Sequence, residues 1–136
     1  MSSLERESAE IKGVSQIETV DILTLDSYIK ENNISTMYPF IKIDVEGHEM
    51  AVLKGAEETI KTLYPTMLIE IFELTHIKKA FKIFSSLNYK VFGINFGSEN
   101  ILTEVKTIDA LETYQASDYL FVYQKEIIKG LIEKHF

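Results

Sequence analysis

Acidic residues stand at the ends of two apolar runs in this sequence. Asp44 and Glu46 follow the first run, and Glu70 and Glu73 close the second. If the runs are neighbouring strands, these acids can converge in the crevice where open α/β sheets bind ligands. Close carboxylates repel, so one would have a raised pKa suited to general-base work, or the group would hold a hard cation. In the plainer alternative, Glu46 and Glu49 serve a helix N-terminus and Glu73 is solvated.

Two histidines add candidate general bases, because imidazole changes its charge near neutral pH. His48 stands directly beside the first acids, whereas His76 is equally well explained as a surface residue at a helix start. The pair His48-Glu49 is not a zinc-binding His-Glu-x-x-His motif, because position 52 is Val. The chain contains no cysteine, which excludes thiolate chemistry and Cys-based zinc sites. We therefore predict no metal site.

The spacing of apolar residues predicts an α/β fold in which strands and helices alternate. An uninterrupted apolar run, Met67–Ile69, is typical of a parallel strand with helices on both faces. We therefore expect a mainly parallel sheet. The predicted strands are Phe40–Asp44, Thr66–Glu73, Tyr89–Ile94 and Asp118–Gln124, with weaker signals at Thr19–Thr24 and Ile101–Val105.

Helices are predicted at residues 25–32, 47–63 and 75–87, where apolar residues recur at helical spacing. Thr24 or Asp26 can provide the N-cap of the first helix. Gly55 lies inside the second helix and costs about 1 kcal/mol relative to Ala. We expect this glycine to allow a close approach of the helix to the sheet. Two tyrosines, Tyr114 and Tyr119, are guessed to line a pocket.

The run Ile41-Lys-Ile-Asp-Val-Glu-Gly-His-Glu-Met-Ala-Val-Leu-Lys-Gly-Ala56 resembles the hallmark segment of the FkbM-type S-adenosylmethionine-dependent methyltransferases. Similar in type and spacing are Thr24-Leu-Asp26, Leu68-Ile-Glu-Ile71 and Leu87-Asn-Tyr89, so that the resemblance extends from about Ser2 to Gln124. His48 departs from the small residue expected there.

The resemblance implies an O-methyltransferase that acts on a hydroxyl of a small sugar-like or polyketide-like substrate. It implies a Rossmann-like class I methyltransferase sheet and S-adenosylmethionine as cofactor. By this comparison Asp44, Val45 and Glu46 contact the cofactor. The catalytic candidates are Asp44, Glu46, Glu70 and His48, with Asp44 as the main site acid and Glu46 assisting.

The glycine-rich cofactor turn of such enzymes has no counterpart here, because the six glycines never form a Gly-x-Gly cluster. By resemblance, the chain corresponds to the C-terminal half of a sheet of order 3-2-1-4-5-7-6 whose seventh strand is antiparallel, with strands four, five, seven and six; Asp118–Gln124 would be the antiparallel strand seven. We therefore expect weak or absent cofactor binding by this chain alone. Two alternatives are an inactive remnant that acts in assembly and one half of a split enzyme.

In such a half-sheet the strand Phe40–Asp44 would be a bare edge with unpaired backbone groups. We expect this strand to pair with another chain, in a homo-oligomer or with a complementing N-terminal half, or to be covered by residues 1–24.

The length and composition of the chain limit the other classes of protein to which it could belong. At 136 residues the chain is one domain, and its formal charge of −7 argues against a nucleic-acid partner. No apolar run approaches the roughly 18 residues of a membrane span, and no signal peptide is evident at the N-terminus. We expect a soluble, cytoplasmic protein with a loose lead-in (1–24), an α/β domain (25–124) and an amphipathic tail helix (125–136).

Overall fold

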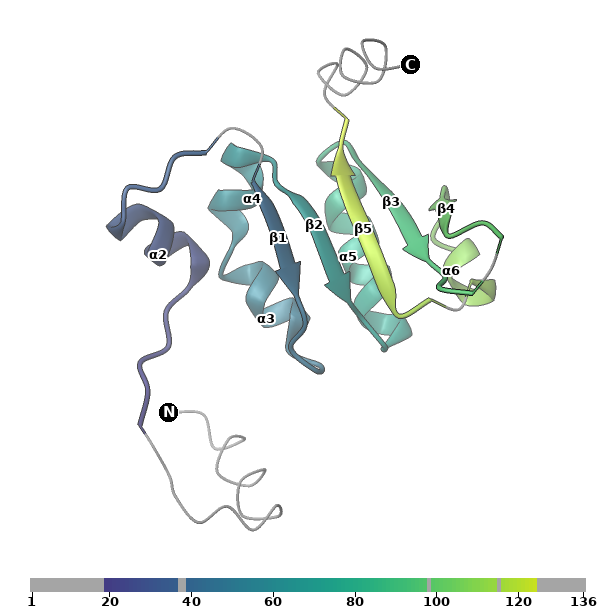
Figure 1. Cartoon of the computed structure of the whole chain (residues 1–136), viewed down its shortest axis with the longest axis horizontal. Coiled ribbons are helices and arrows are strands. Elements are labelled where there is room, and N and C mark those ends of the chain that lie inside the picture. The colour runs from purple at the N-terminus through teal and green to yellow at the C-terminus, as the bar shows by residue number, and fades with distance from the viewer. Residues whose placement is uncertain (1–18, 37–38, 98, 115, 125–136) are drawn as a thin grey trace.

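The computed structural model describes residues 19–36, 39–97, 99–114 and 116–124. In this part of the chain a five-stranded mixed sheet is combined with helices (Figure 1). The elements are α2 (Leu25–Glu31), β1 (Phe40–Ile43), α3 (Glu49–Lys54), α4 (Glu57–Leu63), β2 (Thr66–Glu70), α5 (Leu74–Ser86), β3 (Tyr89–Ile94), β4 (Leu102–Val105), α6 (Ala110–Thr113) and β5 (Asp118–Tyr123). The predicted tail helix 125–136 and most of the predicted lead-in lie outside the described residues.

The strands lie in the order β1-β2-β5-β3-β4. Only the β1–β2 pair is parallel, with Phe40 beside Thr66, and the other three pairs are antiparallel. The prediction of a mainly parallel sheet is therefore wrong. The reason is that β5 lies between β2 and β3 and runs opposite to both, while β4 folds back on β3. The four main predicted segments do follow the expected spatial order, and their assignment to the family's strands four to seven stays a prediction.

The sheet is buried on one face. Along β2, Met67 and Ile69 are fully buried, whereas Leu68 between them is only half-buried. Helices α3, α4 and α5 lie together behind the sheet in Figure 1, and no described helix lies in front of it. The expectation of helices on both faces is thus wrong for the described residues, because the alternating burial marks a sheet with one covered face.

The predicted helix 47–63 is two helices, α3 and α4, separated at Gly55 and Ala56. The carbonyl of Gly55 accepts a hydrogen bond from the backbone N–H of Asp26 at 3.0 Å. A Cβ atom at position 55 would lie 3.2 Å from the Cβ of Thr24. The glycine therefore allows a close approach of the segment that precedes α2. We predicted that Gly55 lets the helix approach the sheet, but the close neighbour is the segment around Thr24.

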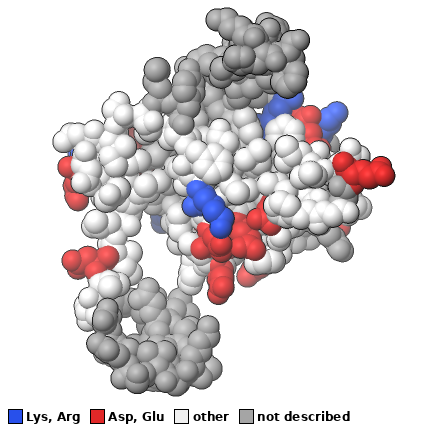
Figure 2. Space-filling view, viewed as in Figure 1, with Lys and Arg blue, Asp and Glu red and all other residues white. Residues whose placement is uncertain are grey.

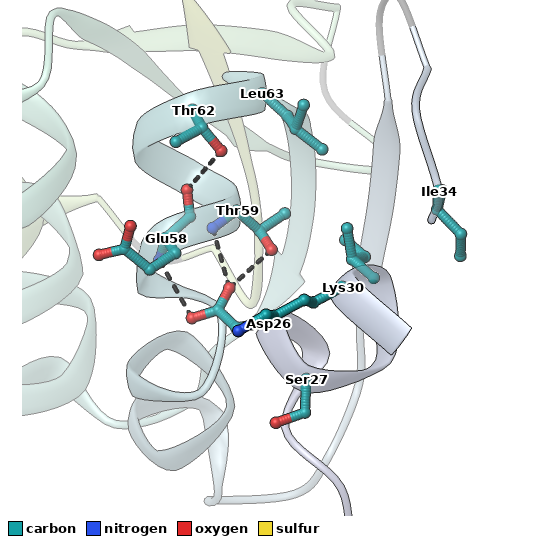
Figure 3. A pocket seen from close by; sticks show the side chains of 9 residues that line it. Asp26, Ser27, Lys30, Ile34, Glu58, Thr59, Thr62 and Leu63 are labelled. Atoms are coloured by element: carbon teal, nitrogen blue, oxygen red, sulfur yellow. Dashed lines mark hydrogen bonds between the residues drawn. The ribbon is translucent and has the colours of Figure 1, made fainter. Parts of the chain in front are cut away.

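The side chains of Thr24 and Asp26 cap two different helices. Thr24 is the N-cap of α2, since its hydroxyl oxygen accepts the N–H of Ser27 at 3.1 Å. The Asp26 carboxylate instead points at the start of α4 and accepts the backbone N–H groups of Glu58 and Thr59 (Figure 3). Asp26 thereby fastens α2 to α4, whose own N-cap residue makes no side-chain cap.

β1 forms one edge of the sheet, as predicted. No described strand pairs with its outer side, and Phe40 at its start is 61% exposed. Residues 19–24 do not form the expected strand, and all six are exposed, so this described part of the lead-in does not cover the edge. Among the described residues, the outer backbone groups of β1 are therefore left without a strand partner. Whether residues 1–18 cover this edge stays a prediction, because they lie outside the described residues.

Candidate functional site

Strands β1 and β2 are parallel, so their C-terminal ends lie side by side at the same end of the sheet. The antiparallel strand β5 begins at this end, so that Asp118 lies beside Glu70. Figure 2 shows acidic side chains gathered around a basic one near this edge. The structure thus collects Asp44, Glu70 and Asp118 from three strand ends, with Lys42 as the nearby cation.

The two carboxyl groups of Asp44 and Glu70 differ in their affinity for protons. A hydrogen bond from Lys42 Nζ, at 3.0 Å, lowers the pKa of Asp44, and hydrogen bonding with Glu70 lowers it further. The same contact with Asp44 raises the pKa of Glu70, with smaller contributions from burial and from the charges of Asp44 and Asp118. One carboxyl is therefore held ionised while its neighbour retains a proton more readily, a division suited to proton transfer.

The turn from β1 into α3 has an unusual backbone. Glu46 and Gly47 have positive φ angles of 44° and 96°, and the N–H of His48 bonds the carbonyl of Val45 at 3.3 Å. Two consecutive residues in the left-handed region give a tight turn, in which a non-glycine residue such as Glu46 is strained. The turn places the backbone N–H of Gly47 2.6 Å from Glu49 Oε1.

Glu49 is a buried carboxylate, with its side chain only 2% exposed. Burial by itself would raise its pKa. The N–H of Gly47, its own N–H and the His76 side chain nevertheless hold the pKa below the usual value. Its Oε2 lies 3.1 Å from His76 Nδ1, and the other ring nitrogen of His76 lies 3.6 Å from Glu73 Oε2. The first residue of α3 is thus joined to the first turn of α5.

A pocket of about 370 Å³ opens beside this pair. Its lining comes from the turn after β1 and the turn after β2, and consists of Glu46, Gly47, Glu49, Phe72 and Glu73. The Phe72 side chain is 70% exposed although it is large and apolar. Such a pocket offers carboxylates as hydrogen-bond acceptors and one aromatic face.

Another pocket, of about 460 Å³, lies between α2 and α4, away from the strand ends (Figure 3). Its most prominent polar group is the Asp26 carboxylate, which already accepts three hydrogen bonds from Glu58 and Thr59. These hydrogen bonds give the carboxylate a structural role in joining the two helices, and this role accounts for its presence in the pocket without a ligand. Among the residues that the structure describes, no group of three or more Asp, Glu or His side chains could hold a metal ion.

The sequence-predicted site residues fall into separate groups. Asp44 and Glu70 lie together, and Glu46 lines the pocket with Glu73. His48 is exposed at the start of α3, where its side chain has no bond to any described residue. The predicted roles of these residues stay predictions.

The guess that Tyr114 and Tyr119 line a pocket has no support in the lining of the pockets at the strand ends. Tyr119 is buried in the core at 2% exposure, and burial raises the pKa of its phenol. The hydroxyl of Tyr114 donates a hydrogen bond to the carbonyl of Gly93 at 3.0 Å. The guess that they line a pocket stays a prediction.

Sequence reasoning did not predict the contacts of three site residues, Asp118, Glu49 and His76. Asp118 begins a strand that pairs with β2, and the register of this pairing, which sets Asp118 beside Glu70, is visible only in the structure. The pairing of Glu49 with His76 had no local signal, since 27 positions separate the two residues. Their contact depends on how α3 and α5 pack behind the sheet.

Comparison with known proteins gives one match. A family model described as "Methyltransferase FkbM domain" matches residues 2–116, which is most of the chain and includes every residue of the site except Asp118. Searches of curated proteins and of solved structures gave no match. Within the described residues, no helix is both long and apolar enough to cross a membrane.

Proposed function

The chain belongs to the FkbM methyltransferase family, and from that premise we propose that it serves S-adenosylmethionine-dependent O-methylation of a hydroxyl on a sugar-like or polyketide-like molecule. The observation that carries the proposal is the pair Asp44–Glu70 at the shared end of two parallel strands. There one carboxyl stays ionised and its neighbour holds a proton more readily. Two neighbouring carboxyl groups with different proton affinities can take part in proton transfer.

The described residues fit the cofactor only in part. Carboxylates such as Asp44 and Glu46 can accept hydrogen bonds from the hydroxyl and ammonium groups of S-adenosylmethionine, and we propose that these two residues and Val45 hold it. No second glycine lies within three residues of Gly47, so a glycine-rich cradle is absent from the turn after β1. When bound, the cofactor would supply an activated methyl group. The groups that bind the rest of the cofactor must therefore come from residues outside this turn.

The exposed edge of the sheet supports a second candidate function. β1 has no described partner on its outer side. We propose that another strand pairs with this edge, from a second copy of the chain or from a complementing N-terminal half, and completes the cofactor site. If no cofactor binds even then, the domain is an inactive relative that acts in assembly.

Calorimetric titration with S-adenosylmethionine and S-adenosylhomocysteine tests the first proposal. Binding that is weakened at least about tenfold by Asp44→Asn, a loss of about 1.4 kcal/mol, would support it. The matched control is Asp109→Asn, an exposed acid at the start of α6, which should leave binding unchanged. A folded chain that releases no heat with either compound contradicts a self-sufficient cofactor site.

Light scattering coupled to size-exclusion chromatography separates the two versions of the second candidate. A dimer that binds the cofactor supports completion of the site across a self-associated edge. A dimer without affinity supports the assembly role. A monomer at every concentration contradicts self-association through β1.

A further inference from the structure

The contact between Glu49 and His76 fixes which ring nitrogen of the histidine is free. Oε1 of Glu49 accepts the N–H of Gly47, and Oε2 lies 3.1 Å from His76 Nδ1, so that Nδ1 is the donor when Glu49 is ionised. A neutral imidazole carries one N–H, and its other nitrogen, Nε2, then has a free lone pair. The side chain of His76 is 19% exposed, and it contacts Glu49 and Glu73, which both line the pocket.

We propose that His76, oriented by buried Glu49, is the base that accepts the proton of the substrate hydroxyl, and that this hydroxyl belongs to a sugar-like ring bound in the pocket beside it. The inference rests on the proposed methyltransferase function and assigns the role of proton acceptor to His76 in place of the Asp44–Glu70 pair. Glu49 acts through His76 and is a positioning residue.

The surroundings of Nε2 support this role. Its neighbour on the pocket side is Glu73 Oε2, and their separation of 3.6 Å is too long for a good hydrogen bond. The Glu73 side chain is 61% exposed and can move aside when a ligand enters. A substrate hydroxyl placed between His76 Nε2 and the Glu73 carboxylate would donate its hydrogen bond to Nε2. The carboxylate carries no hydrogen that it could donate to the hydroxyl.

The composition of the pocket favours a sugar-like ring. Phe72 presents an exposed aromatic face, on which the C–H groups of a ring can pack. Glu46 and Glu73 line the same pocket and offer carboxylate oxygens to neighbouring hydroxyls. A purely apolar acceptor would leave both carboxylates without partners, which is costly wherever it removes water from them.

The proposed step conserves atoms and charge. The O–H bond of the substrate breaks, its proton moves to His76 Nε2, and the electron pair stays on the oxygen, which becomes the nucleophile. The imidazolium that forms is stabilised by the ionised Glu49 carboxylate, which keeps its own proton state. The base is thereby held in one tautomer and one orientation.

A structural role for the same contacts predicts something different. If His76 were a doubly protonated link between Glu49 and Glu73, it would join the β1–α3 turn to α5 and could not accept a proton. The protonation of the two ring nitrogens therefore distinguishes the roles, and it can be measured without substrate or cofactor.

Nitrogen-15 NMR of histidine-labelled full-length chain at pH 7.5 makes this measurement. We expect His76 to be protonated on Nδ1 only, and Glu49→Gln to abolish this single tautomer. Glu57→Gln, which makes the same change at an exposed glutamate outside the site, is the matched control and should leave the His76 signals unchanged. Protonation of both nitrogens, or of Nε2 alone, would overturn the proposal whether or not the chain methylates anything.

The sugar-like occupant is tested by titrating the labelled chain with methyl α-glucoside. The His76 signals should shift on binding, and Phe72→Leu should weaken the binding about 3- to 10-fold. Phe96→Leu alters another exposed phenylalanine, outside the pocket, and should have no effect. No shift at His76, or equal effects of both substitutions, would overturn the assignment of the pocket to sugars.

If methyl transfer is observed, His76→Gln should lower kcat about 10²- to 10⁴-fold with little change in KM. Glu49→Asp should restore part of the activity lost in Glu49→Gln, because a carboxylate is again present. An unchanged kcat in His76→Gln would overturn the catalytic role while leaving the methyltransferase function standing.

Discussion

The carboxylate of Asp26 accepts hydrogen bonds from the backbone N–H and the hydroxyl of Thr59, at 2.8 and 2.6 Å. The two residues are 33 positions apart, so that a residue of α2 caps the start of α4. The same aspartate donates its own N–H to the carbonyl of Gly55 at the end of α3. Asp26 therefore joins α2 to the end of α3 and to the start of α4.

Asp26→Ala should lower the free energy of unfolding by about 1–2 kcal/mol, the usual cost of removing a helix N-cap. Asp26→Asn should cost less, because the amide oxygen can still accept from Thr59. Asp109→Ala serves as the control, since Asp109 occupies an N-cap position without a side-chain cap bond. Urea unfolding checks this, and equal effects at positions 26 and 109 would contradict the cap.

The cap should also make stability depend on pH. Hydrogen bonds from Thr59 and Glu58 lower the pKa of Asp26, against the opposing effect of burial, which is the largest single cause. A carboxyl whose pKa is lowered by folding contributes stability above its unfolded value and loses it as the pH falls through the folded value. Thermal melts of the wild type should therefore fall more steeply on acidification than those of Asp26→Asn.

Glu49→Gln should cost about 1.5–3 kcal/mol, because it removes the charge from a buried group that accepts hydrogen bonds from Gly47 and His76. Glu57→Gln breaks an exposed ion pair with Lys61 and should change stability by under about 1 kcal/mol. Chemical denaturation compares the two variants. A cost at position 49 no larger than that at position 57 would show that the buried contact contributes little.

Glu46→Gly should raise stability by about 1 kcal/mol, since glycine adopts the left-handed conformation of this turn without steric cost. Asn88→Gly is the matched control. Asn88 also has a positive φ, of 62°, but asparagine tolerates it and should gain less. If Glu46→Gly is destabilising, the Glu46 side chain must make a stabilising interaction that outweighs the strain.

Gly93→Ala should destabilise the protein by at least about 1–3 kcal/mol, because a Cβ there would lie 2.0 Å from the ring of Tyr114. Gly55→Ala, with its nearest contact at 3.2 Å, should be milder. The double variant Gly93→Ala with Tyr114→Leu should recover part of the loss. Additive costs in denaturation experiments would mean that the tyrosine ring is not the obstacle.

Local patterns were sufficient to predict most of the elements. Apolar runs located β1, β2, β3 and β5, because burying one face of a strand needs apolar side chains wherever the strand lies. The acidic turn after β1 was also evident, and Thr24 was one of two N-cap candidates, since both features depend on a few neighbouring residues. The long segment around Asp44–Gly47 indicated the family, which the family model confirms.

Pattern reasoning failed where two distant segments decide the outcome. The apolar pattern favoured a mainly parallel sheet, because the period of a strand does not encode its direction. The family resemblance, and not the pattern, implied that the last strand is antiparallel, and β5 runs opposite to both β2 and β3. The division of helix 47–63 followed from Asp26, whose carboxylate supplies a cap that α4 lacks in its own sequence.

The sequence by itself determined the residue types at the site and the family to which the chain belongs. The tertiary structure alone decided their grouping: Asp118 joins Glu70 through strand pairing, and Glu49 meets His76 through the packing of α3 near α5. The physical reason is that hydrogen bonds and charge interactions act over a few ångströms in space. Separation along the chain says nothing about that distance until the sheet and helices are in place.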